Sequence, residues 1–258
     1  GTVGANKPFK DIAAGLAARG VATIRYVKRT LLYGQDFIGK AFTLKDEVTE
    51  DVTSAIEYAK TLSEVDKNQI YVLGHSLGGM LAPRIATQHP ELKGIILAAA
   101  PARKFSEVAI EQFQYLLAKS TDTSSASKEA FSKAIADFKA AGQIRPNTLP
   151  ADSVIAGLPV SYWLDINNVD QVNAAKKLKK TQMLILQGGN DYQVTEEDLN
   201  IWRNAFKARK NVSFKLYPML NHVFSFVSEK GDGQQYLKPG NVDEIVVSDI
   251  AEWINTKK

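Results

Sequence analysis

A serine in a glycine-rich turn is the residue of this chain best suited to nucleophilic chemistry. Residues 74–78 read Gly-His-Ser-Leu-Gly, a G-x-S-x-G pattern centred on Ser76. The apolar run at 69–73 predicts a strand before the turn, and the pattern at 77–88 predicts a helix after it. In a strand–turn–helix setting the serine hydroxyl projects towards a base that can remove its proton. We therefore interpret Ser76 as a nucleophile rather than as a surface serine beside flexible glycines.

The neighbours of Ser76 have expected roles of their own. Gly74 and Gly78 are expected to be required, because side chains there would collide where strand and helix pack closely. Leu77 begins the predicted helix, so its backbone N–H can stabilise an oxyanion with help from the helix dipole. The ring of His75 is expected to face away from the nucleophile and to support the turn.

A serine nucleophile needs a base, and the chain has three histidines. His75 lies inside the turn itself. His89 precedes Pro90 at a predicted helix end, where a cationic side chain is ordinary. His222 follows a predicted strand in a short loop, which leaves it as the one credible base for Ser76.

An acid is needed to orient that base, and Asp191 is the clearest candidate. It follows the predicted strand at 182–187, and open α/β sheets carry functional side chains at the C-terminal ends of their strands. Its role would be to hold the tautomer of His222 and to stabilise the imidazolium. The alternative is an aspartate that only forms a turn. Other acids nearby lie on the following predicted helix or before the strand: Asp198, Asp165 and Asp170.

The elements that must position these residues predict an α/β fold with a mostly parallel, doubly wound sheet. Short apolar runs alternate with longer helical patterns, which is typical of βαβ units. The predicted strands are 21–27, 69–73, 94–98, 182–187 and 212–217. The predicted helices are 9–19, 45–62, 77–88, 196–208 and 242–255.

One segment departs from this alternation. Residues 103–170 show helical patterns and no good strand, which predicts a helical cap inserted between two parts of the core, 1–102 and 171–258. The alternative is that the inserted helices pack on the sheet and contact no ligand. Aromatic residues at such spacing often belong simply to the hydrophobic interior. Five of them are nevertheless candidates for an apolar substrate pocket beside His75: Phe113, Tyr115, Tyr162, Trp163 and Tyr192.

Composition excludes several classes of function. The chain has no cysteine, which excludes disulfides, thiolate metal sites and a cysteine nucleophile. The net charge of +4 is small for 258 residues, and no aromatic platform lies among the lysines, so we expect no nucleic-acid partner. No apolar run is long enough to span a bilayer, and residues 1–10 lack the apolar core of a signal peptide. We expect a soluble protein, cytoplasmic or secreted, with no membrane partner.

With these residues identified, the chain resembles bacterial carboxylesterases of the α/β-hydrolase class that are related to the dienelactone hydrolases. The resemblance covers essentially the whole chain and rests on segments such as VLGHSLGGMLAPRIA, SYWLD, LILQGGNDYQV and FKLYPMLNHVF. It implies hydrolysis of short-chain acyl esters through an acyl-enzyme, with no cofactor and no metal. It also implies that Ser76, Asp191 and His222 occupy the triad positions of the family.

The beginning of the chain departs from the family it resembles. Val27 stands where relatives tend to carry an acidic residue. Relatives also have an HGSGP-like oxyanion loop just before the segment that matches Gly1, so the second oxyanion donor is expected upstream of that residue. The strand leading into this loop is normally central, between the strands predicted here at 21–27 and 69–73.

An unfilled central position would leave strand edges unpaired inside the sheet, which is costly. We therefore expect the gap to be closed in one of three ways. The flanking strands pair directly, a partner chain supplies a strand in a homo-oligomer or by strand exchange, or a segment outside this numbering fills it. The sequence does not choose among them.

Other functions stay open beside the esterase. The same triad serves peptidases, thioesterases and acyltransferases, which differ in substrate. A catalytically impaired scaffold used for binding is a further alternative, since one oxyanion donor is missing from this numbering.

Overall fold

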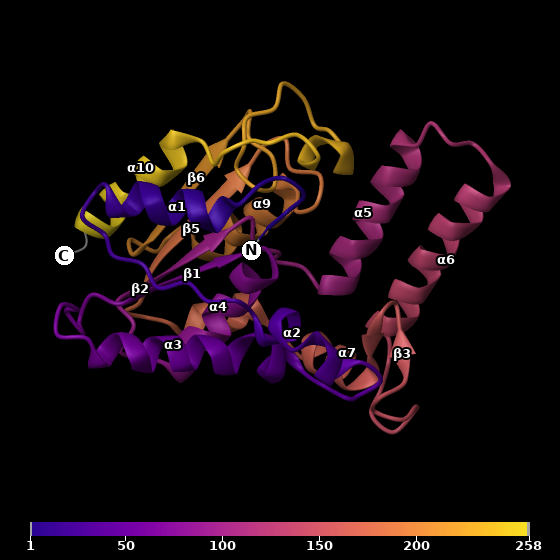
Figure 1. The fold of residues 1–258 in the computed structure, drawn as a ribbon, viewed down its shortest axis with the longest axis horizontal. Helices are drawn as coiled ribbons and strands as arrows, with labels where there is room; N and C mark the ends of the chain where they lie inside the picture. The colour runs from indigo at the N-terminus through magenta and orange to yellow at the C-terminus, as the bar shows by residue number, and fades with distance from the viewer. Residues whose placement is uncertain (1, 257–258) are drawn as a thin grey trace. The chain divides into compact units, whose positions relative to one another are not determined.

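A computed structural model of the chain describes residues 2–256 (Figure 1). The chain divides into two compact units. The sheet unit comprises the residues up to 26, residues 55–102 and those from 171 onward. The helical unit comprises residues 27–54 and 103–170, so it contains the predicted insertion together with an earlier piece of the chain.

The sheet unit is built on four strands, all parallel, in the order β1-β2-β5-β6. The strands are β1 (Tyr71–His75), β2 (Gly94–Ala98), β5 (Gln182–Gly188) and β6 (Val212–Tyr217). Four of the five predicted strands are therefore present, and the predicted parallel α/β sheet is confirmed. Strand β2 is buried along its whole length, as expected for the inner strand of a sheet covered on both faces.

Alternate residues of the inner strands pack against different helices. Ile96 of β2 and Leu184 of β5 belong to one buried cluster with residues of α1 (Pro8–Ala17) and α10 (Glu244–Thr256). These two helices lie side by side in Figure 1. Because side chains alternate along a strand, the intervening residues face the other side of the sheet. The other helices of this part of the chain are α4 (Leu77–Gln88), α8 (Gln171–Lys177), α9 (Glu196–Phe206), the short η3 (Gly233–Tyr236) and the part of α3 (Glu50–Thr61) that follows residue 54.

The predicted strand at 21–27 is wrong. Residues 21–28 form no strand, and most of their apolar side chains are exposed, with Val27 58% exposed and Ile24 and Tyr26 43% exposed. Val21, at the start of the segment, is half-buried against the core. Strand β1 pairs with β2 alone, so direct pairing of the two flanking segments is also wrong for the described residues. An extended β-branched run becomes a strand only when a neighbour completes its hydrogen-bond ladder.

The helical unit contains a long helix pair, α5 (Phe105–Lys119) and α6 (Ser125–Gly142), drawn side by side in Figure 1. The hydroxyl of Ser124 caps α6 by accepting the N–H of Ser127 at 3.2 Å. No strand was expected in 103–170, yet two residues each of β3 (Val154–Ile155) and β4 (Leu158–Pro159) form an antiparallel hairpin. The other elements are α2 (Arg29–Leu32), η1 (Gly34–Phe37), η2 (Lys45–Thr49) and α7 (Val160–Asn167).

Across residues 2–256, none of the helices combines the length and the apolar character that crossing a bilayer requires.

Candidate active site

Ser76 lies in a strained turn between β1 and α4. Its φ of 55° and ψ of −120° are rare for a residue with a side chain, and its N–H donates to the carbonyl of Ala98 on β2 at 2.9 Å. The helix begins at Leu77, so the N–H groups of the first turn lie next to the serine. This is the geometry expected of a nucleophile elbow.

The elbow depends on Gly74 and Gly79 rather than on Gly74 and Gly78. A Cβ at Gly74 would lie 2.1 Å from the backbone oxygen of Gly78, and one at Gly79 would lie 2.7 Å from the side chain of Ala100. A Cβ at Gly78 would have open space around it. The expectation that Gly78 prevents a collision is therefore wrong, because the close approach of helix and sheet falls one residue later.

The predicted base and acid are in direct contact. Nδ1 of His222 lies 2.7 Å from Oδ2 of Asp191, and both side chains are buried. Because a carboxylate can only accept, Nδ1 carries the hydrogen, and Nε2 of the neutral ring is then free to take a proton. The two loops approach closely at Gly188, where a Cβ would lie 2.4 Å from the carbonyl oxygen of Leu220.

Asp191 is held on both of its oxygens. Oδ1 accepts the backbone N–H groups of Gln193 at 2.7 Å and Val194 at 3.0 Å. Oδ2 accepts from His222 and also from the side-chain amide of Gln187 at 3.2 Å. Sequence reasoning missed Gln187, because a polar residue at the end of a predicted strand carries no distinctive signal.

His75 links the elbow to the loop that carries His222, the predicted base. Its Nε2 lies 2.8 Å from the backbone oxygen of His222, and the centroids of the two rings are 4.6 Å apart. Removal from water, followed by the neighbouring His222, lowers the pKa of His75 to about 3. The ring is therefore neutral at ordinary pH, and its Nε2 must carry the hydrogen that the carbonyl accepts. This contact brings the residue next to Ser76 against His222.

The other predicted pocket residues have contacts inside their own units. In the sheet unit, the ring of Tyr192 is buried beside that of Tyr236. In the helical unit, Nε1 of the buried Trp163 donates to the carbonyl of Ile155, and the buried Tyr162 donates to Glu47. Phe113 packs on other phenylalanines of the same helix pair, and Tyr115 lies near the ammonium of Lys119. A role for these residues in binding substrate stays a prediction.

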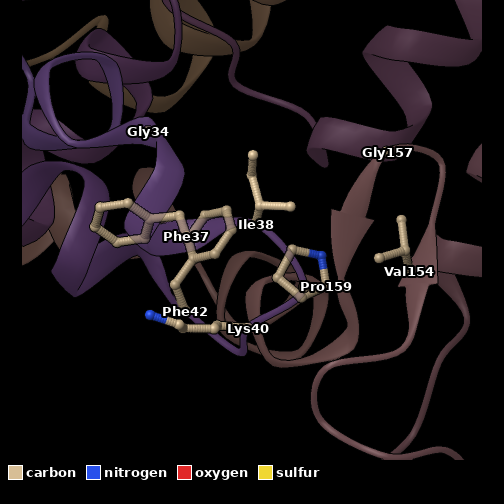
Figure 2. A pocket seen from close by; sticks show the side chains of 9 residues that line it. Gly34, Phe37, Ile38, Lys40, Phe42, Val154, Gly157 and Pro159 are labelled. Atoms are coloured by element: carbon tan, nitrogen blue, oxygen red, sulfur yellow. The ribbon is translucent and has the colours of Figure 1, made fainter.

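The helical unit has a hollow of its own, with a volume of about 260 Å³. Figure 2 shows the rings of Phe37 and Phe42 close together, with Ile38 and Pro159 beside them. The walls come from the segment at 34–42 and the β3–β4 hairpin, and they include none of the predicted pocket residues.

One described cluster has the composition of a metal site: Glu57, His89 and Glu91. The ammonium of Lys60 lies 2.8 Å from Glu57 and also pairs with Glu91. The hydrogen bond from Lys60 is the main cause that lowers the pKa of Glu91 to about 2. A cation therefore already occupies the position between the carboxylates, and the cluster is an ion-pair network.

Comparison with known proteins gives two sequence matches. The sequence profile of a family described as serine aminopeptidase, S33, matches residues 39–227, which is more than half of the chain. A curated relative, Esterase EstD of Thermotoga maritima, is 36% identical over 253 residues, covering 98% of this chain and 58% of the relative. The chain thus spans less than two thirds of the length of that relative.

Solved structures share the architecture at low identity. The esterase domain of a Rhodothermus marinus protein matches with a TM-score of 0.55 and 16% identity, over 96% of this chain and 80% of that one. A monoacylglycerol lipase of Paleococcus ferrophilus matches with a TM-score of 0.53 and 14% identity, over 100% and 92%. At such identities the agreement concerns the fold alone.

Proposed function

This chain has the α/β-hydrolase fold and belongs to the family described as serine aminopeptidase, S33, and from that we propose that it is a serine carboxylesterase. Its substrates would be short-chain acyl esters, as the resemblance to carboxylesterases implies. The 36% identity to a named esterase supports an ester substrate. The observation that carries the proposal is the buried hydrogen bond between His222 and Asp191, in the unit that also holds the strained Ser76.

In the proposed first step, Nε2 of His222 takes the hydroxyl proton of Ser76 while Oγ attacks the ester carbonyl carbon. A tetrahedral oxyanion forms, and the N–H of Leu77 at the start of α4 donates to it. Asp191 stabilises the imidazolium without itself becoming protonated. When the carbon–oxygen bond to the alcohol breaks, His222 returns the proton to the departing alkoxide, leaving an acyl group on Ser76.

The second step mirrors the first. His222 removes a proton from water, the hydroxide attacks the acyl carbon, and the carboxylic acid leaves as Ser76 regains its proton. Both steps need the same tautomer of His222, and the bond from Nδ1 to Asp191 keeps that tautomer in place. No cofactor takes part in either step.

The test is a panel of p-nitrophenyl esters from acetate to decanoate, hydrolysed by the purified chain and by Ser76→Ala. We expect hydrolysis that is fastest for the short acyl chains and is lost in the variant. Equal hydrolysis by both proteins would contradict the role of Ser76, and a preference for decanoate would contradict the assigned chain length.

A peptidase is the second candidate, because the matched family is described as serine aminopeptidase. The same triad would cleave an amide by the same two steps, with an amine as leaving group. Aminoacyl p-nitroanilides distinguish the two functions. Turnover of these amides that exceeds turnover of the esters would favour the peptidase.

A further inference from the structure

Gln187 lies at the C-terminal end of β5, and its side-chain amide reaches into the loop that carries Asp191. Nε2 lies 2.8 Å from the carbonyl oxygen of Val194, 3.1 Å from that of Gly188 and 3.2 Å from Oδ2 of Asp191. The side chain is only 2% exposed. A buried amide is costly unless it is hydrogen-bonded, so its position is set by these acceptors.

Two of the three contacts are with backbone carbonyls of the loop, and the third is with the side chain of Asp191. The amide has two hydrogens for three acceptors, so one hydrogen is shared between two of them. The contacts with the carbonyls of Gly188 and Val194 join the two ends of the turn. The contact with Asp191 falls on Oδ2, the oxygen that accepts from His222. Gln187 therefore touches the atom through which the acid orients the base.

With this donor, each oxygen of the Asp191 carboxylate accepts two hydrogen bonds. Oδ1 is held by the N–H groups of Gln193 and Val194, and Oδ2 by Gln187 and His222. Rotation of the carboxylate about its last bond by less than a half-turn would strain all four. Because the amide of Gln187 is uncharged, it fixes this orientation without cancelling the negative charge that an imidazolium at His222 requires.

We propose that Gln187 is a positioning residue of the triad, holding Oδ2 of Asp191 towards Nδ1 of His222. The inference rests on the proposed function and extends it, since it assigns a fourth residue to the reaction. Gln187 acts through Asp191 and touches no reacting atom.

The first test replaces Gln187 by Met, which keeps the length of the side chain and removes the donor. We expect kcat for ester hydrolysis to fall about tenfold, equivalent to ~1.4 kcal/mol, with KM unchanged. The matched control is Gln171→Met, because Gln171 is also a buried glutamine of the sheet unit and its amide bonds to the carbonyl of Pro101. The control should lose stability without losing kcat, and an equal fall of kcat in both variants would overturn the proposal.

The second test uses Gln187→Glu and a pH profile. As a neutral acid, the new side chain can donate to Asp191, but once ionised it only accepts and repels that carboxylate. Other titratable groups around the pair are His75 from β1, Tyr192 from the acid loop and Tyr236 from η3. These are the same in both proteins, so a new loss of activity as the pH rises, absent from the wild-type chain, is the expected signature. A profile that superimposes on wild type would contradict the inference.

A third measurement does not depend on activity. The proton on Nδ1 of His222 should give a slowly exchanging low-field NMR resonance in the wild-type chain, absent in Asp191→Asn. In Gln187→Met we expect that resonance to shift and to broaden through faster exchange, and an unchanged resonance would overturn the positioning role. If the esters are not hydrolysed at all while the resonance responds to Gln187→Met, the proposed function fails and the positioning inference survives.

Discussion

At the scale of residues, His222, the proposed base, is held both at its ring and at its backbone carbonyl. Nδ1 of His222 is bound to Asp191, and its backbone carbonyl is bound to His75. Ser76 and His222 could be selected as candidates from the G-x-S-x-G pattern and from the elimination of the other histidines. The contacts of His75 and Gln187 could not, because each depends on which loop lies opposite the end of a strand.

The first prediction concerns the stability of the fold and His75. Its pKa of about 3 in the folded chain lies below the ordinary value of 6.5, so only the unfolded state takes up a proton between these values. The contribution of neutral His75 to the free energy of unfolding is complete above pH ~6.5. It falls as the pH drops towards 3, by at most about 1.4 kcal/mol per pH unit. We expect His75→Gln, which keeps a donor for the carbonyl of His222, to lose less stability than wild type between pH 7 and 4.5.

Denaturant unfolding at the two pH values measures this difference. Parallel losses in the two proteins would show that His75 already takes up a proton in the folded state.

At the scale of elements, the position of Ser76, the proposed nucleophile, follows from the close packing of α4 on the sheet. The strand and helix around the elbow could be predicted from hydrophobic pattern, as could β2, β5 and β6. Of the two glycines that permit the packing, Gly74 could be predicted and Gly79 could not. The G-x-S-x-G pattern marks Gly78, whereas the contact with Ala100 falls on Gly79. Residues 21–27 have the composition of a strand, but local composition does not report whether a neighbouring strand is present.

The second prediction compares Gly74→Ala with Gly78→Ala. A methyl group at position 74 meets the backbone of the following helix, so we expect a loss of about 1–3 kcal/mol in the free energy of unfolding and a slower reaction of Ser76. At position 78 the methyl group has space and lies in a helix, so stability should be unchanged or higher by about 0.4–1 kcal/mol.

Thermal or urea unfolding of the two variants checks this contrast. The same loss in both would mean that the elbow packs differently from the arrangement described above.

At the scale of the whole molecule, the sheet of the described residues ends at β1, the strand that leads to Ser76. On the side that faces β2, the carbonyl of Ile70 accepts a backbone hydrogen bond and the N–H of Ser76 donates one. Since N–H groups alternate along a strand, Val72 and Gly74 point to β2, and Tyr71 and Leu73 point to the open edge. Of the three ways expected to close the gap, a strand from a partner chain and a segment outside this numbering stay as predictions.

The third prediction is that the amide of Leu73 exchanges with solvent much faster than that of Val72 in the monomer of this chain. Residue-resolved hydrogen exchange, with the mass of the species measured by light scattering, checks it. Slow exchange of Leu73 that appears only in a larger species would support a strand from a partner chain. Slow exchange of Leu73 in the monomer would contradict the open edge.

The central claim is that Ser76, His222 and Asp191 act as one catalytic unit, and the rate of labelling by a fluorophosphonate tests it most directly. We expect one label, located at Ser76 by mass spectrometry of the wild-type chain and absent from Ser76→Ala. The rate should fall by about a thousandfold or more in His222→Ala and also fall steeply in Asp191→Asn. A labelling rate that is unchanged in His222→Ala, or a label on another residue, would contradict the account.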